Sequence, residues 1–120
     1  MVEILAVDDS PSMRALVEAT LQKAGHSVIP ACDGLEALEV AKKKRVNLVL
    51  ADVNMPHMDG ITLVKELRQL PDYRFVPILM LTTEVSAERR KEAKSAGATG
   101  WLVKPFEPSR LLTMIARVVE

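Results

Sequence analysis

Five short apolar runs alternate along this chain with five longer segments in which apolar residues recur at helical spacing. The runs cover Val2–Val7, Ser27–Ala31, Val46–Ala51, Val76–Thr82 and Gly100–Val103. Two of them, Val46–Ala51 and Val76–Thr82, are apolar almost throughout, which is typical of strands that are buried on both faces. Strict alternation of strand and helix predicts a parallel sheet with helices on both sides.

Local signals place the helices between these runs. Ser10-Pro11 joins a capping hydroxyl to a proline at the first helical position, and Gly25 supplies a C-terminal stop. The other predicted helices begin near Gly34, Gly60, Ser86 and Glu107. We therefore predict an α/β fold, a flavodoxin-like, doubly wound, five-stranded parallel sheet of order 2-1-3-4-5 with five helices. A closed barrel of eight strands needs about twice this length.

The apolar positions also predict which side chains are buried. Leu35, Leu38 and Ala41 are expected to face inward from the second helix, and Cys32 is expected to be a small buried residue. Pro30 places the second strand at an edge of the sheet, because proline cannot donate to a ladder. The fourth helix offers only alanines to the core, so we expect it to bury little area and to be easily displaced.

Composition narrows the class of protein. At 120 residues we expect a single domain over residues 1–120, with no output domain. Sixteen basic and sixteen acidic residues cancel, which argues against binding to nucleic acid or to an anionic membrane. We interpret the basic run Lys42–Arg45 as a solvated helix end. One cysteine, no signal peptide and no apolar run of roughly 20 residues favour a cytoplasmic protein.

Polar residues stand immediately after four of the five predicted strands. They are Asp8 and Asp9 after the first, Asp52 after the third, Thr82 and Thr83 at the end of the fourth, and Lys104 after the fifth. Strands one and three are neighbours in the predicted order, so three carboxylates converge where such sheets bind ligands. Repulsion among them is relieved by a hard cation such as Mg²⁺, and Lys104 with a threonine hydroxyl completes a phosphoryl pocket. Asp52 is then the candidate in-line nucleophile.

Each of these residues also has a structural interpretation. Acidic residues at strand ends often cap the following helix, and Asp9 before Ser10-Pro11 is placed for that role. A Lys-Pro pair such as Lys104-Pro105 is usually a turn. The functional interpretation depends on the four strand ends taken together.

The combined motifs resemble a response-regulator receiver domain over essentially the whole chain. They are Asp8-Asp9-Ser10, Asp52 followed by Met55-Pro56 and Asp59-Gly60, then Thr82, and Lys104-Pro105-Phe106. The resemblance implies that Asp52 is the phosphoacceptor and that Asp9, Asp52 and the backbone carbonyl of Asn54 bind Mg²⁺. It implies that Asp8 acts through metal-bound water, that Lys104 binds the phosphoryl group, and that the Lys104–Pro105 peptide bond is cis.

The resemblance also selects the switch residues. Strand alternation lets only one of Thr82 and Thr83 face Asp52, and the family alignment selects Thr82 as the switch hydroxyl. The family commonly has Tyr or Phe where this chain has Trp101. Trp101 is either a packing residue or a side chain that moves inward with Thr82, and its size demands more room for a full swing. The predicted output surface carries Arg89, Arg90, Trp101 and Arg110.

The leading hypothesis is a phosphorylation-activated signalling switch rather than an enzyme, of the stand-alone chemotaxis CheY type. It implies a sensor histidine kinase of the CheA type as phosphodonor, a flagellar motor switch protein or another target, and a phosphatase as a further candidate partner. The alternatives are a phosphorelay shuttle, a receiver from a longer regulator, and a hydrolase that uses an aspartyl-phosphate intermediate. A hydrolase would need a general acid or base beside Asp52, which the motifs do not supply.

Overall fold

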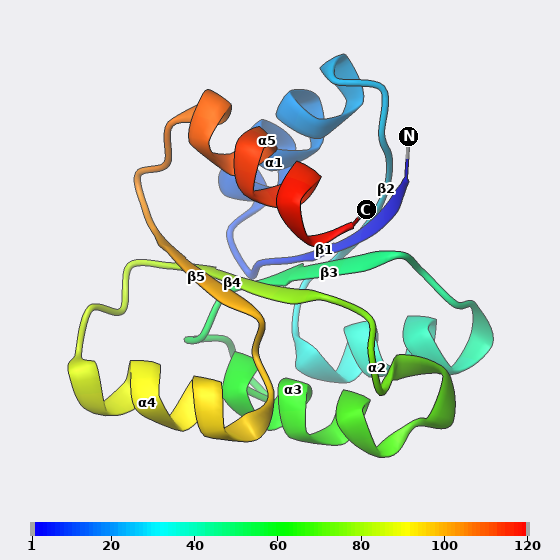
Figure 1. Cartoon of the computed structure of the whole chain (residues 1–120), viewed down its shortest axis with the longest axis vertical. Helices are drawn as coiled ribbons and strands as arrows, with labels where there is room; N and C mark the ends of the chain where they lie inside the picture. Colours follow the sequence, from blue (N-terminus) through cyan, green and yellow to red (C-terminus); the bar gives the residue numbers. More distant parts are fainter. Residues whose placement is uncertain (1, 120) are drawn as a thin grey trace.

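The computed structural model describes residues 2–119. Strands and helices alternate along these residues (Figure 1). The strands are β1 (Glu3–Val7), β2 (Ser27–Ala31), β3 (Leu48–Ala51), β4 (Ile78–Thr82) and β5 (Gly100–Val103). The helices are α1 (Pro11–Lys23), α2 (Gly34–Lys43), α3 (Gly60–Gln69), α4 (Ala87–Ala96) and α5 (Pro108–Val118), with a short 3₁₀ helix η1 at Pro71–Tyr73.

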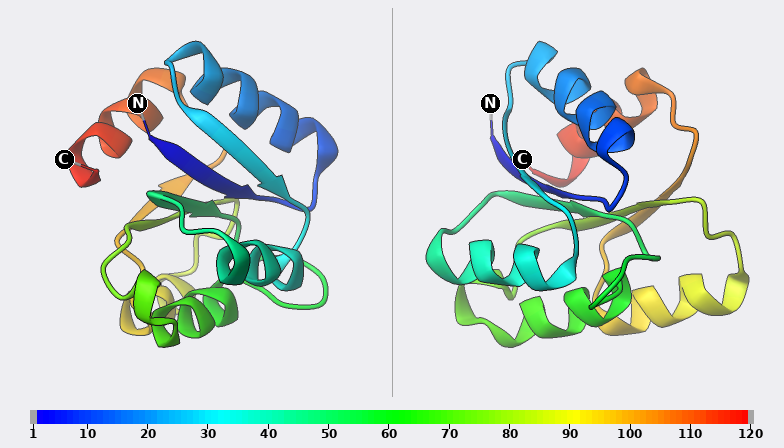
Figure 2. Two further views of the ribbon diagram at one scale, coloured as in Figure 1. Left: turned by 90° about the vertical axis from the view of Figure 1, so that its right-hand side faces the viewer. Right: turned by 180° about the vertical axis from the view of Figure 1, so that it is seen from behind.

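The strands form one parallel sheet in the order β2-β1-β3-β4-β5, which confirms the predicted fold class and strand order. Helices α1 and α5 cover one face and α2, α3 and α4 cover the other, so the molecule has three layers (Figures 1 and 2). Strand β2 lies at an edge, as Pro30 predicted. Because all strands run the same way, their carboxyl ends meet at one edge of the sheet.

Two apolar clusters fill the spaces between the layers. The cluster under α2, α3 and α4 includes Leu63, Val64 and Leu67 of α3, all with 0% of their surface exposed. The cluster under α1 and α5 includes Leu111 and Ile115, which are equally buried. Each such side chain contributes about 1.5–3 kcal/mol through burial. The central strands are therefore held rigidly from both sides.

Side-chain caps fix where four of the helices begin. The caps are Ser10 for α1, Asp33 for α2, Asp59 for α3 and Ser86 for α4, each accepting a hydrogen bond from the amide three residues later. Such a cap stabilises a helix by about 1 kcal/mol. Helix α4 ends at Gly97, whose φ of 115° is left-handed, and Ala93 is its buried residue. The prediction that α4 buries little area is therefore confirmed.

Several predicted boundaries and core positions were wrong. Strand β3 begins at Leu48 rather than Val46, because the Val46 amide donates to the Tyr73 hydroxyl at 3.1 Å instead of joining the ladder. Strand β4 begins at Ile78, directly after Pro77, which has no amide hydrogen to donate.

Leu35 and Cys32 are exposed, although both were predicted to be buried. In α2 the buried stripe consists of Gly34, Ala37, Leu38 and Ala41, so Leu35 falls just off it. Cys32 follows Ala31, the buried last residue of β2, and strand alternation turns Cys32 outward.

No helix within residues 2–119 is both long enough and apolar enough to span a bilayer.

Candidate functional site

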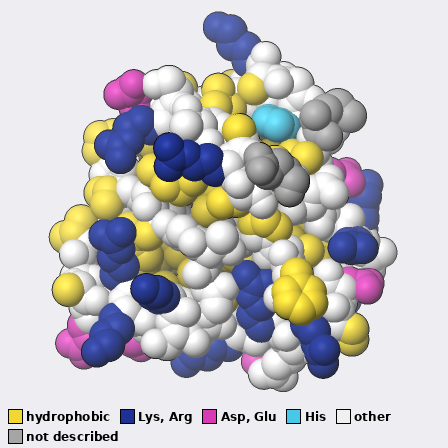
Figure 3. Space-filling view, viewed as in Figure 1, with side chains coloured by type: hydrophobic (Ala, Val, Ile, Leu, Met, Phe, Trp, Pro, Cys, Tyr) yellow, Lys and Arg dark blue, Asp and Glu magenta, His cyan; other side chains and the backbone are white. Residues whose placement is uncertain are grey.

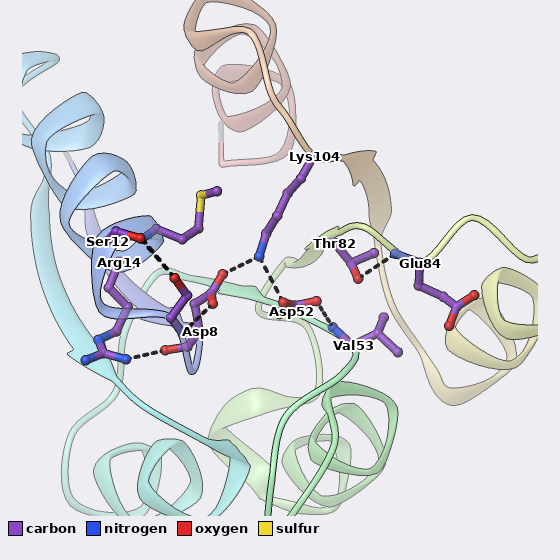
Figure 4. A network of polar contacts seen from close by, with 10 residues as sticks. Asp8, Ser12, Arg14, Asp52, Val53, Thr82, Glu84 and Lys104 are labelled. Atoms are coloured by element: carbon purple, nitrogen blue, oxygen red, sulfur yellow. Dashed lines mark hydrogen bonds and ion pairs between the residues drawn. The ribbon is translucent and has the colours of Figure 1, made fainter.

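The polar residues predicted at the strand ends lie at one edge of the sheet. Residues Val7 of β1 and Ala51 of β3 are direct partners in the ladder, so Asp8 and Asp52 leave the sheet side by side. Thr82 of β4 pairs with Val103 of β5, which places Lys104 one residue beyond. Figure 4 shows that Lys104 reaches from the β5 side toward Asp8 and Asp52.

The Lys104 ammonium binds both carboxylates. Its Nζ donates to Oδ2 of Asp52 at 2.9 Å and to Oδ2 of Asp8 (Figure 4). The three side chains are buried, with 7–9% of each exposed. Burial alone would lower the pKa of Lys104, but hydrogen bonds to Asp8 and Asp52 and their negative charges raise it above its ordinary value. Lys104 is therefore a permanent cation between two acidic groups at neutral pH.

Backbone groups hold the other carboxylate oxygens. Oδ1 of Asp52 accepts a hydrogen bond from the Val53 amide at 2.7 Å, and Oδ1 of Asp8 accepts one from the Ser10 amide at 2.9 Å. Arg14 donates from Nη1 to the Asp8 carbonyl at 2.6 Å, which fixes the turn between β1 and α1. Arg14 was not predicted as a site residue. Its position in the first turn of α1, the helix that follows β1 and Asp8, could have indicated it. Both carboxylates are thus fixed in orientation.

Three carboxylates are close enough together to share a cation. Asp8, Asp9 and Asp52 each offer one oxygen, and these oxygens lie within 4.8 Å of one another. Asp9 is exposed, so the cluster opens toward solvent. An all-oxygen set with open positions suits Mg²⁺, which keeps several water ligands. The residues present therefore fit the predicted metal. Asn54 is exposed in the same loop, two residues beyond Asp52.

The loop after β3 is shaped by close backbone approaches. The Gly60 amide donates to the Val53 carbonyl at 2.8 Å, and a Cβ at residue 60 would lie 2.0 Å from the Asp52 carbonyl oxygen. Only glycine fits there. His57 has a left-handed φ of 68°, and its Nδ1 lies 2.8 Å from Oδ2 of Asp33, the α2 cap. This loop is thereby tied to the start of α2, which limits how far Asp52 can move.

Thr82 and Thr83 point to opposite sides. Thr82 is completely buried, and its Oγ1 accepts a hydrogen bond from the Glu84 amide at 3.0 Å, whereas Thr83 is exposed. Figure 4 shows the hydrogen bond between the Glu84 amide and the Thr82 hydroxyl, beside Asp52. The Lys104–Pro105 bond is cis, as the resemblance implied. Among the predicted residues, Asp8, Asp9, Asp52 and Lys104 are brought together, and Thr82 lies beside them in another hydrogen bond.

The predicted output residues do not form one uniform surface. Trp101 is half-buried against the core, and with Arg90 it lines a hollow of about 250 Å³ next to α4. Trp101, Arg90 and Arg110 also line a neighbouring hollow of about 400 Å³. Arg89 instead pairs with Glu92 at 3.3 Å and approaches Asp59, the α3 cap, at 3.9 Å. Arg89 therefore faces α3 and the phosphoacceptor loop, away from the other three.

Comparison with known proteins agrees with this geometry. The family model of the response regulator receiver domain matches residues 4–116. The chain is 39% identical to chemotaxis protein CheY-3 of Vibrio cholerae over 119 residues, which is 98% of this chain and 92% of the relative. It is 40% identical to the probable transcriptional regulator ycf27 of Porphyridium aerugineum, over 98% of this chain and 48% of that relative. This chain therefore spans about half of ycf27.

Solved structures share the fold over the whole length. A structure of Vibrio cholerae chemotaxis protein CheY4 superposes with a TM-score of 0.94 at 54% identity, covering 98% of both chains. The receiver domain of a Pseudomonas aeruginosa sensor histidine kinase, with a magnesium ion coordinated in its active site cleft, gives 0.92 at 32% identity. That match covers 98% of this chain and 97% of the other.

Proposed function

Because this chain belongs to the response regulator receiver family of two-component signalling, we propose that Asp52 accepts a phosphoryl group from a histidine kinase. The transfer forms a bond between phosphorus and an Asp52 carboxylate oxygen, while the bond between phosphorus and the imidazole nitrogen of the donor histidine breaks. The contact of the Lys104 ammonium with both Asp8 and Asp52 is the observation that carries this proposal. A buried cation beside a fixed carboxylate is what stabilises charge on a transferring phosphoryl group.

The acidic cluster supports a role for Mg²⁺. Asp8, Asp9 and Asp52 would hold the ion, with the Asn54 carbonyl as the further ligand that the family resemblance implies. The ion would neutralise negative charge on the phosphoryl oxygens and on the carboxylates that surround them. Lys104 supplies a second positive charge from β5, and the Val53 amide keeps the Asp52 carboxylate in place.

The hydrogen bond of Thr82 suggests how phosphorylation is transmitted. Its hydroxyl holds the Glu84 amide, and the Glu84 carboxylate accepts from the Ser86 amide at 3.1 Å, directly at the start of α4. If the Thr82 hydroxyl turns to a phosphoryl oxygen on Asp52, the loop between β4 and α4 loses the hydrogen bond between the Glu84 amide and Thr82. Helix α4 has one buried side chain, Ala93, so its displacement costs little. Trp101, packed beside α4, then changes its environment.

Tryptophan fluorescence tests this coupling, because the chain has one tryptophan. Beryllofluoride with Mg²⁺ should change the Trp101 emission of the wild-type protein. Thr82→Ala should still bind beryllofluoride, measured by fluorine NMR, yet lose most of the emission change. Thr82→Ser, which keeps the hydroxyl, should retain the response, and so should Thr83→Ala on the exposed side. A full emission change in Thr82→Ala would contradict the proposed route.

The similarity to chemotaxis proteins supports a specific target. We propose that a CheA-type kinase phosphorylates the chain and that the surface of Arg90, Trp101 and Arg110 then binds a flagellar motor switch protein. Arginine and tryptophan beside a hollow are typical anchors of an interface. Arg89 is a weaker candidate for direct contact, because Glu92 and Asp59 already lie against it.

Arg90→Ala should weaken binding of the cognate motor switch protein to the beryllofluoride form about tenfold, equivalent to about 1.4 kcal/mol, measured by calorimetry. The rate of phosphorylation should not change, because Arg90 lines the hollows beside Trp101, whereas Asp52 contacts Lys104. Lys91→Ala is the matched control, since Lys91 lines the hollow between α3 and α4 on another side of the same helix. Equal loss of binding in both variants would show a general charge effect instead of a contact.

A receiver within a longer regulator is the second candidate, favoured by the match to about half of ycf27. The length of the native gene decides between it and a stand-alone switch. An aspartyl-phosphate hydrolase is disfavoured by the site, because the side chain bound to Asp52 is the Lys104 ammonium, which is not a proton acceptor.

A further inference from the structure

One large apolar side chain lies almost entirely in solvent at the edge of the sheet opposite Asp52. Phe75 has 93% of its surface exposed, more than any other large hydrophobic residue among those described. It precedes β4, so it lies at the amino ends of the parallel strands, while Asp52 follows β3 at their carboxyl ends. An exposed hydrophobic residue alone is common, and the surroundings of Phe75 decide its meaning.

The backbone that carries Phe75 is fixed on both sides. Arg68 of α3 donates from Nη1 to the carbonyls of Tyr73 at 2.7 Å, Arg74 at 3.3 Å and Val76 at 2.7 Å. Tyr73 has 1% of its surface exposed, and its hydroxyl donates to the Lys44 carbonyl at 2.7 Å. Phe75 is therefore displayed from a rigid segment, so a partner that binds it would order little additional backbone.

Basic residues lie at the end of α2 that contacts the segment carrying Phe75. The contact of Tyr73 with Lys44 brings η1 against the end of α2, where the run Lys42–Arg45 is exposed, and Arg74 adds a further positive charge. Among the described residues, Glu3 pairs with Lys44 at 2.8 Å, and the exposed Asp72 lies beside Tyr73 in η1. The five exposed basic residues Lys42–Arg45 and Arg74 therefore outnumber Glu3 and Asp72 here, although the net charge of the chain is zero. Figure 3 shows hydrophobic side chains beside Lys and Arg where β4 begins.

We propose that this amino-edge patch (Lys42, Lys43, Arg45, Arg74 and Phe75) docks an acidic peptide segment that carries apolar side chains. The positive charge favours an acidic partner and speeds its association. Burial of the Phe75 ring against apolar side chains of the partner would supply binding energy that charge attraction alone does not provide. A partner bound here leaves the Asp52 edge free. The patch would hold the protein at an acidic partner whether or not Asp52 is phosphorylated, which goes beyond the proposed switch.

A labelled peptide of Glu-Glu-Leu repeats is the probe, with binding measured by fluorescence anisotropy at low and at physiological ionic strength. The wild-type protein should bind this peptide more tightly than an all-Glu peptide of equal charge. Phe75→Ala should weaken binding of the Leu-containing peptide about tenfold and leave the all-Glu peptide unaffected. Leu16→Ala is the matched control, because Leu16 is 50% exposed on α1, and it should bind like the wild type.

Three results would overturn the proposal. They are equal binding by the wild type and Phe75→Ala, binding of a thymidine oligonucleotide as tight as that of the peptide, and loss of peptide binding when beryllofluoride and Mg²⁺ occupy the other edge. The oligonucleotide result would indicate a general anion surface. Peptide binding is measured both with and without beryllofluoride. The measurement without beryllofluoride tests the patch even if the proposal that Asp52 is phosphorylated proves wrong.

Discussion

Lys104→Met should lower the free energy of unfolding by about 2–3 kcal/mol in metal-free buffer, measured by urea denaturation at neutral pH. Removing the ammonium leaves the Asp8 and Asp52 carboxylates, which are 8% and 9% exposed, close together without their cation. Methionine keeps most of the side-chain volume, so the loss reports on charge more than on packing. Uncompensated like charges in a partly buried site repel strongly.

Two comparisons isolate this effect. Mg²⁺ should restore part of the lost stability of Lys104→Met, because a bound cation replaces the missing charge. Combining Lys104→Met with Asp8→Asn should be less destabilising than Lys104→Met alone, since one of the two facing charges is gone. Lys91→Met, on the exposed surface of α4, should change stability by no more than about 0.5 kcal/mol. A Lys104→Met protein as stable as the wild type would mean that the cation contributes nothing to holding the site together.

Arg68→Ala should cost about 3 kcal/mol of stability, although Arg68 is remote from the phosphoacceptor. Its guanidinium donates to the carbonyls of Tyr73 and Val76, and also to the Gly97 carbonyl at 2.8 Å through Nη2. Burial lowers the pKa of Arg68, yet the side chain keeps its place because carbonyl oxygens surround its donors. Charge-assisted hydrogen bonds contribute about 1.5–3 kcal/mol each before the cost of ordering the side chain is subtracted.

The Arg68→Ala substitution should also destabilise particular segments of the chain more than others. Gly97 ends α4, so hydrogen exchange should accelerate in the last turn of α4 and in the segment before β4 more than in β1 or β3. Arg68→Lys should retain the charge but recover less than half of the stability, because an ammonium cannot reach both Gly97 and Val76 in the guanidinium geometry. Arg117→Ala, in the exposed last turn of α5, is the matched control. Equal stability of the Arg68→Ala and Arg117→Ala proteins would contradict this role.

The sequence predicted the fold because its periodicities are simple. Apolar runs such as Val76–Thr82 and the parallel arrangement that they demand place Asp8, Asp52, Thr82 and Lys104 at one edge without any knowledge of side-chain contacts. The choice between Thr82 and Thr83 agrees with the burial of the first and the exposure of the second.

Contacts between side chains and backbone carbonyls were not predicted. Every residue has a backbone carbonyl, so the sequence does not show which carbonyl will accept a hydrogen bond from a side chain. Arg14 and Arg68 both bind carbonyls. The position of Arg14 in the first turn of the helix after β1 was a signal that could have found it, but the spacing of Arg68 carried none. The direct bond of Lys104 to Asp8 was not expected either, since the resemblance assigned Asp8 to metal-bound water. Arg89 and Arg90 were both predicted as output residues, and that role stays a prediction for each. Neighbours on a helix point about 100° apart, so Arg89 approaches Asp59 while Arg90 lines the hollow beside Trp101.

Intact-protein mass spectrometry after incubation with Mg²⁺ and acetyl phosphate tests the central claim most directly. The wild-type protein should gain the mass of one phosphoryl group, and reduction of the adduct with borohydride followed by peptide mapping should locate it at Asp52. Removal of Mg²⁺ with a chelator should suppress the adduct, and Asp52→Asn should give none. A phosphoryl adduct that persists on the Asp52→Asn protein, or that maps to another residue of the wild type, would contradict the assignment of Asp52 as phosphoacceptor.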